Sequence, residues 1–175
     1  KEILKKISKC DFVVDQLYGD SPMASLVAEA AWLGKPSVVA GYGLEKLKEF
    51  VPKEMWPPSQ ICHPDEISNA IEELIIDRTK LTNLARQTQL FVKDKYNPKK
   101  VAMRFLNLIE GEISNDSWID PMDVFYIEGG GQSRNLLKDN MLQLLKEYGV
   151  NSLCLSHRSD LEEAFLKFSG FKEHK

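Results

Sequence analysis

Small and hydroxylated residues gather in one turn of this chain, just before a short helix that carries a single carboxylate. Such side chains let backbone N–H groups approach a phosphate, and the N-terminal end of a helix favours negative charge. Pro22 has no N–H group, but the three residues after it keep theirs. The turn is therefore a candidate site for an anionic ligand such as a phosphate. The candidate ligand-binding residues of the turn and the helix are Gly19, Asp20, Ser21, Met23, Ala24, Ser25 and Glu29.

Glu29 is the carboxylate of that helix. If Leu26 marks the centre of the buried stripe, a rotation of 100° per residue places Glu29 about 60° away, at the edge of the stripe. There it can bind a neighbouring backbone N–H group or accept hydrogen bonds from two vicinal hydroxyls of a ligand. The alternative is an ordinary solvated glutamate. For the turn, the alternative is a plain helix start with Ser21 as the N-cap.

Short apolar runs on either side of this helix predict strands. Residues 11–15 form a β-branched run long enough for a buried strand, and residues 36–40 form a second one. Helix-forming residues run from about 23 to 33 between them, with Gly34 at the C-terminal cap. Residues 59–62 are a weaker third candidate. This alternation predicts an α/β fold with a parallel sheet flanked by helices.

Three consecutive helices are expected after the third strand. Pro64 and the two acidic residues that follow it are typical of a first helical turn. Apolar residues then recur at helical spacing, and Asn97-Pro98 is expected to cap the last of the three helices. His63 has no partner carboxylate or nucleophile at a usable spacing, so we interpret it as a structural residue.

A change in composition near residues 111–121 predicts a boundary between two units. There Gly, Ser, Asn, Asp and Pro replace the periodic apolar pattern. Residues 1–112 would form the first unit. Residues 113–175 would form a small α/β extension.

The extension is expected to begin with a strand at residues 124–127, followed by a tight turn of three glycines. Ser133 then precedes a helix that Gly149 ends. Ser159 and Glu162 have the spacing of a capping box, which predicts the start of a last helix.

Composition excludes several classes of protein. The chain has 175 residues, enough to bury a core, and its net charge of -3 gives no field that would attract nucleic acid. No apolar run approaches the ~20 residues that span a bilayer, and we expect neither a membrane-spanning helix nor a signal peptide in this sequence. The three cysteines lack metal-ligand spacing. They predict no metal site, and a reduced, cytoplasmic compartment in which the thiols are buried.

Two segments of the first unit carry a longer pattern: residues 11–17, Asp-Phe-Val-Val-Asp-Gln-Leu, and residues 29–39, Glu-Ala-Ala-Trp-Leu-Gly-Lys-Pro-Ser-Val-Val. They resemble the C-terminal lobe of GT-B-fold glycosyltransferases of the large retaining group, over about residues 7–110 of this chain. The resemblance implies a Rossmann-like sheet. It also implies that Glu29 matches the second glutamate of the family's Glu-x7-Glu motif, which holds the ribose of the donor nucleotide. Ser21 stands in place of the first glutamate, where the family contacts the donor sugar and its phosphates.

The function implied by this resemblance is that of an enzyme, a hexosyltransferase-type glycosyltransferase. Its donor would be a UDP- or GDP-linked sugar and its acceptor a sugar or a lipid-linked molecule. The setting would be bacterial surface-polysaccharide or glycoconjugate biosynthesis, in the cytoplasm or at the inner face of the membrane. Neither a cofactor nor a metal is implied.

The first residue, Lys1, already lies in a helical pattern, so we expect this chain to be a piece of a longer polypeptide. The resemblance places the basic phosphate-binding residues and the acceptor-side base in an upstream N-terminal lobe. We therefore expect the chain to be inactive alone. Two alternatives stay open: a nucleotide-sugar 2-epimerase or hydrolase of the same fold, and a non-catalytic binding module.

Overall fold

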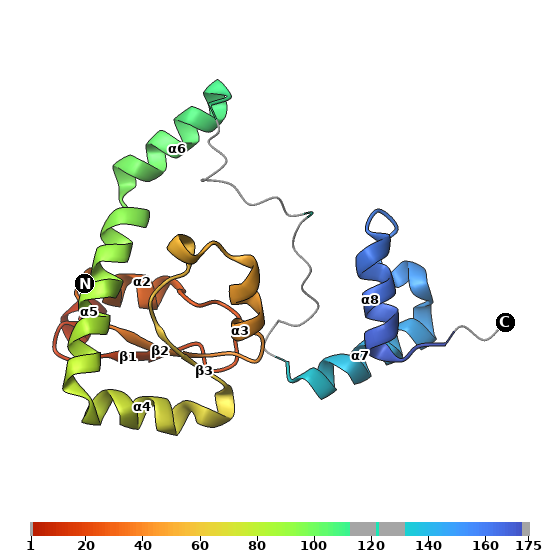
Figure 1. Cartoon of the computed structure of the whole chain (residues 1–175), viewed down its shortest axis with the longest axis horizontal. Helices are drawn as coiled ribbons and strands as arrows, with labels where there is room; N and C mark the ends of the chain where they lie inside the picture. Colours follow the sequence, from red (N-terminus) through yellow and green to blue (C-terminus); the bar gives the residue numbers. More distant parts are fainter. Residues whose placement is uncertain (1, 113–121, 123–131, 173–175) are drawn as a thin grey trace.

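The computed structural model describes residues 2–112, 122 and 132–172 (Figure 1). Its first part is an α/β unit in which helices flank a three-stranded parallel sheet of order β1-β2-β3, so the predicted fold class is confirmed for this part. Each strand lies within its predicted run. The strands are β1 (Val13–Asp15), β2 (Ser37–Ala40) and β3 (Gln60–Cys62).

Helices cover both faces of the sheet (Figure 1). α2 and α5 lie against one face and α4 against the other, and α4, α5 and α6 are the three consecutive helices that were predicted. The helices of this part are α1 (Glu2–Ile7), α2 (Ser25–Trp32), α3 (Leu44–Leu47), α4 (Ile67–Ile76), α5 (Arg78–Lys95) and α6 (Pro98–Glu110). Short 3-10 turns lie at Lys48–Phe50, Lys53–Met55 and Pro64–Glu66.

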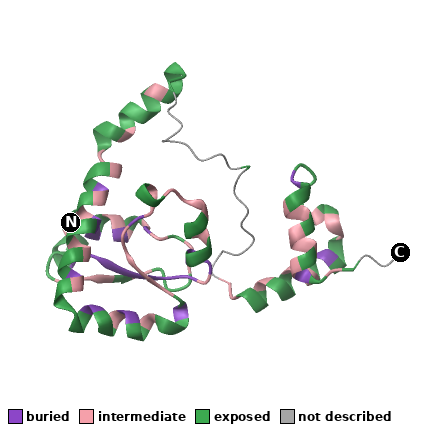
Figure 2. Cartoon of the chain, viewed as in Figure 1, coloured by how far each residue is buried: buried purple, intermediate pink, exposed green. Residues whose placement is uncertain are grey.

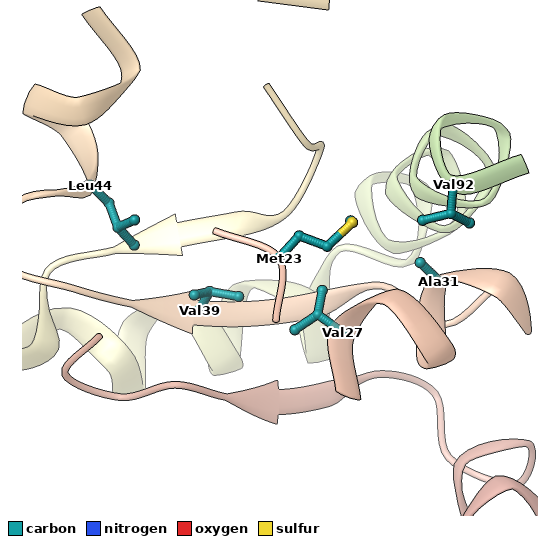
Figure 3. Packing of buried hydrophobic residues seen from close by; sticks show 6 residues of the cluster. All are labelled: Met23, Val27, Ala31, Val39, Leu44 and Val92. Carbon is teal, nitrogen blue, oxygen red and sulfur yellow. The ribbon is translucent and has the colours of Figure 1, made fainter. Parts of the chain in front are cut away.

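All four residues of β2 are buried (Figure 2), because this strand lies between β1 and β3 and has helices on both faces. On one face, Val39 belongs to a cluster with Val27 and Ala31 of α2 and Val92 of α5 (Figure 3). Successive strand residues point to opposite faces, so the other face needs a core of its own.

Val38 forms that second core. It packs with Ala70 and Leu74 of α4 and with Leu81 of α5. Because α5 contributes side chains to both clusters, this long helix joins the two layers that enclose the sheet.

Two of the predicted helix ends are confirmed. The side chain of Asn97 caps α6, since its Oδ1 accepts hydrogen bonds from the N–H groups of Lys99 at 3.0 Å and Lys100 at 3.4 Å. Gly34 follows the last residues of α2 with a φ of 72°, a left-handed conformation that glycine adopts without steric cost.

The second described part contains α7 (Arg134–Tyr148), a 3-10 turn at Val150–Leu153 and α8 (Ser159–Ser169), and α7 packs against α8. Ser133 precedes α7 as predicted, and its side chain also caps the helix, because its Oγ accepts from the N–H of Leu136 at 3.4 Å. Gly149 ends that helix. The predicted strand at 124–127, the glycine turn at 129–131 and most of the predicted boundary lie outside the described residues.

The predicted capping box at the start of α8 is wrong. Ser159 is already the first residue of the helix, and the residue before it, Arg158, occupies the N-cap position without a side-chain cap. The Arg158 side chain is only 8% exposed and donates two hydrogen bonds to Asp160, Nε to Oδ1 at 2.9 Å and Nη2 to Oδ2 at 2.7 Å. An acidic side chain in the first turn therefore interacts with a buried arginine.

This ion pair gives a pH prediction. The hydrogen bonds from Arg158 lower the pKa of Asp160 from its ordinary value of 3.8 to about 2. Because the folded-state pKa lies below the unfolded value, the pair stabilises the fold above about pH 4, and this contribution is lost as the pH falls through about 2. An NMR titration of the Asp160 side-chain carboxyl should give a midpoint near 2. In Arg158→Gln the midpoint should rise toward 3.8; equal midpoints in the two proteins would contradict the assignment.

Candidate functional site

The predicted turn lies at the carboxyl ends of the three strands, which is where open α/β sheets bind their ligands. Backbone hydrogen bonds draw the segments after the strands together. The N–H of Ala40 donates to the carbonyl of Gln16 at 2.9 Å, and the N–H of Gly41 donates to the carbonyl of Cys62 at 3.2 Å. The three strand ends therefore form one continuous edge.

Gly19 and Asp20 hold the first two of these segments against each other. The Oδ1 of Asp20 accepts a hydrogen bond from the N–H of Gly43 at 3.0 Å. The carbonyl oxygen of Gly19 lies so close to Gly41 that no Cβ fits at that position. The structure thus gives both predicted site residues a role in shaping the edge.

Met23, Ala24 and Ser25 lead directly into α2. The Met23 side chain lies in the core cluster of Figure 3 and is 9% exposed. α2 begins at Ser25, so its N-cap is Ala24, which makes no side-chain cap. The first N–H groups of a helix have no intrahelical partner, and the helix dipole makes this end positive. This end of α2 therefore has backbone N–H groups that are free of intrahelical bonds, and anion binding there stays a prediction.

Ser21 does not cap α2, and that interpretation is wrong. It is exposed and lies three residues before the N-cap. A chain of hydroxyl groups fixes the turn instead: Ser59 Oγ donates to the carbonyl of Pro22 at 3.2 Å and accepts from Ser37 Oγ at 3.2 Å. The turn is held from the sheet side, which leaves Ser21 on the solvent side.

Glu29 lies on the exposed face of α2 rather than at the edge of the buried stripe, so the predicted position is wrong. The helix buries Val27, Ala30 and Ala31, and Leu33 is 37% exposed. Glu29 is about 160° around the helix from Val27, because each residue turns 100°. In the part of the chain that the structure describes, the Glu29 carboxylate has neither a hydrogen bond nor an ion pair, so both oxygens can accept from a ligand.

No protein-family model matches this chain, and no significantly similar curated protein or solved structure was found. The described residues contain no cluster of three or more His, Cys, Asp or Glu side chains that could hold a metal ion. None of the described helices is both long enough and apolar enough to cross a bilayer.

Two aromatic side chains at the same edge, Tyr18 and Tyr42, were missed by the sequence analysis, and a third, His63, was interpreted there only as a structural residue. The rings of Tyr18 and Tyr42 stack with their centroids 6.2 Å apart at 29°, and His63 meets Tyr42 edge-on at 5.1 Å. We call Tyr18, Tyr42 and His63 the aromatic rim. Each follows the end of a different strand within three residues. The ends of neighbouring parallel strands meet at one edge of a sheet. An aromatic residue shortly after each predicted strand was therefore the sequence signal that could have identified the rim.

Asp15 and Gln16 were also missed. Asp15 closes β1, and its buried Oδ2 has no hydrogen-bond partner among the described residues. Gln16 has a φ of 45°, which is rare for a residue with a side chain and is typical of strained functional turns. The sequence signal that could have identified Asp15 was a carboxylate at the carboxyl end of an apolar strand.

Cys62 lies at the same edge but is not suited to nucleophilic chemistry. Burial raises the pKa of its thiol, and the nearby Glu66 carboxylate raises it further. A reactive cysteine needs a lowered pKa. All three cysteines are free thiols; Cys10 and Cys62 are half-buried, whereas Cys154 is exposed, contrary to the expectation of buried thiols.

Proposed function

We propose that this chain supplies the donor-binding part of a GT-B-fold glycosyltransferase, with a Rossmann-like sheet of which β1, β2 and β3 are a part. The observation that carries the proposal is the carboxylate of Glu29, which has no partner among the described residues, on the helix whose N-terminal end, without a side-chain cap, lies at the carboxyl edge of a parallel sheet. Glu29 lies four residues after Ser25, which is about 6 Å along the helix axis. This separation suits a ligand with vicinal hydroxyls near a diphosphate, as in a nucleotide sugar.

The chemistry assigned to these residues is binding and charge stabilisation. Glu29 accepts hydrogen bonds from the ribose hydroxyls. The N–H groups at the start of α2 and the helix dipole stabilise the negative charge of the diphosphate, which is the leaving group when the sugar is transferred to an acceptor hydroxyl. The residue that activates that hydroxyl, and the basic groups for the phosphates, are proposed to lie in an upstream lobe.

Calorimetric titration of this chain with UDP, GDP and sugars linked to them tests the proposal. We expect at least one of these ligands to bind, and Glu29→Ala to weaken that binding by about 1–3 kcal/mol, the usual cost of losing hydrogen bonds to a charged group. The fold should be kept, because Glu29 is exposed and unpaired in the described structure. A matched control is Glu72→Ala, which removes an exposed carboxylate from α4. The proposal is overturned if no ligand gives heat, or if Glu29→Ala and Glu72→Ala bind alike.

A further inference from the structure

We infer that the aromatic rim is a platform for the ring of a neutral sugar. The inference rests on the proposed function, because it assigns the part of the site that lies beyond the diphosphate. The rim is made of Tyr18, Tyr42 and His63, one from the segment after each strand.

The exposure of these rings separates them from the core. Tyr18 is 57% exposed and the His63 side chain is 47% exposed, whereas the residues of β2 beneath them are fully buried. Tyr42, between the two, is half-buried. A group of partly exposed rings at the carboxyl edge of a parallel sheet offers an apolar surface at the place where such sheets bind ligands.

The polar atoms of the rim suit hydroxyl groups. Each tyrosine has a hydroxyl that both donates and accepts. The Nδ1 of His63 accepts from the N–H of Asp65 at 3.3 Å, so the neutral ring carries its proton on Nε2 and can donate from there. The carboxylate Oδ2 of Asp65 also lies 3.4 Å from Nδ1 of His63. Nδ1 does not carry a proton for this carboxylate, because a protonated nitrogen has no lone pair with which to accept from the Asp65 N–H.

A pyranose ring matches this combination. It has C–H groups on its faces, which pack on aromatic rings, and hydroxyls around its edge, which bond to Tyr and His side chains. None of the three rim residues has a fixed negative or positive charge, so the rim favours a neutral ligand over a phosphate.

The order of the groups along the chain agrees with this assignment. From Glu29 the helix leads back to its N-terminal end at Ser25, and the turn leads from there to Tyr18 at the edge of the sheet. In the proposed function these positions take the ribose, the diphosphate and the sugar in turn, which is their order in a nucleotide sugar.

The rim is held in place before a ligand arrives. The hydrogen bond between Asp20 Oδ1 and the N–H of Gly43 joins the segment that carries Tyr18 to the one that carries Tyr42. The bond from Ala40 N–H to the Gln16 carbonyl fixes the base of the first segment. Stacking on preorganised rings costs less conformational entropy than stacking on mobile ones.

Saturation-transfer NMR with the full chain and the methyl glycosides of glucose, galactose and mannose tests the rim. At least one glycoside should receive saturation on the C–H groups of one ring face. Tyr18→Ala should weaken its binding about fivefold, the scale of one lost ring contact. Tyr18→Phe should keep most of the signal, and Tyr148→Ala, which removes an exposed tyrosine from α7, should keep all of it.

The assignment is overturned if no glycoside is saturated, or if Tyr18→Ala and Tyr148→Ala give equal signals. It is also overturned if uridine or guanosine, and no glycoside, is saturated in a manner that depends on Tyr18, because the rim would then bind the base. Titration with UDP and GDP separates the two proposals. If a diphosphate binds in a manner that depends on Glu29 and no glycoside binds, only the assignment of the rim is overturned. If a glycoside binds in a manner that depends on Tyr18 and no diphosphate binds, the proposed donor site is overturned.

Discussion

Gly41→Ala is expected to destabilise the fold by about 3 kcal/mol, at the upper end of the cost of forcing an extra methyl group into a packed site. The added Cβ would overlap the carbonyl oxygen of Gly19 and would lie 2.9 Å from Cγ of Leu44, a core residue. A backbone oxygen cannot move without displacing the turn between β1 and α2. We therefore expect the substitution to disturb the candidate site as well as the stability.

The control is Gly19, which lies in the turn between β1 and α2 and faces Gly41. A Cβ added at Gly19 would meet the end of the flexible Gln16 side chain, which can rotate away, so Gly19→Ala should cost less than about 1 kcal/mol. Urea unfolding of the two variants and the parent protein, followed by circular dichroism, gives the comparison. If Gly41→Ala is no less stable than Gly19→Ala, the close approach of the two strand ends is contradicted.

Leu74→Ala is the second substitution with a large expected effect, also about 3 kcal/mol. Leu74 lies on α4, is fully buried and packs with Val38 of the central strand and with Leu81 of α5. Removing its side chain leaves a cavity between the sheet and two helices that cannot both move inward.

Ile76→Ala is the matched control, because Ile76 ends the same helix but is 72% exposed. Its loss should change the free energy of unfolding by less than about 0.5 kcal/mol. Thermal and urea unfolding measure both variants. If Leu74→Ala and Ile76→Ala lower the free energy of unfolding equally, the packing of Leu74 between α4 and the sheet is contradicted.

Local sequence was sufficient for most of the elements. The apolar runs identify all three strands, because a strand between two helical layers needs side chains that can be buried on both faces. Asn97, Ser133 and Gly34 mark helix ends through bonds and backbone angles that involve only near neighbours. These signals are local, so tertiary contacts did not override them.

The prediction for Ser21 failed because the neighbours that decide the turn are distant in sequence. Ser21 is not the cap of α2, because Met23 enters the core and the hydroxyl of Ser59 holds the turn. The capping box of α8 failed for a local reason instead: Ser159 is already the first residue of the helix, and Arg158 takes the N-cap position.

By itself the sequence determined the three strands of the described sheet, most of the helices, the α/β class and the position of a helix start after β1, since these depend on local pattern and backbone geometry. Only the tertiary structure decided that Glu29 faces solvent, because the contacts of α2 with the sheet and α5 choose which side of the helix is buried. It also brought Tyr18, Tyr42 and His63 together. Parallel pairing joins strand ends that are more than twenty residues apart in the chain, and no local pattern encodes those contacts.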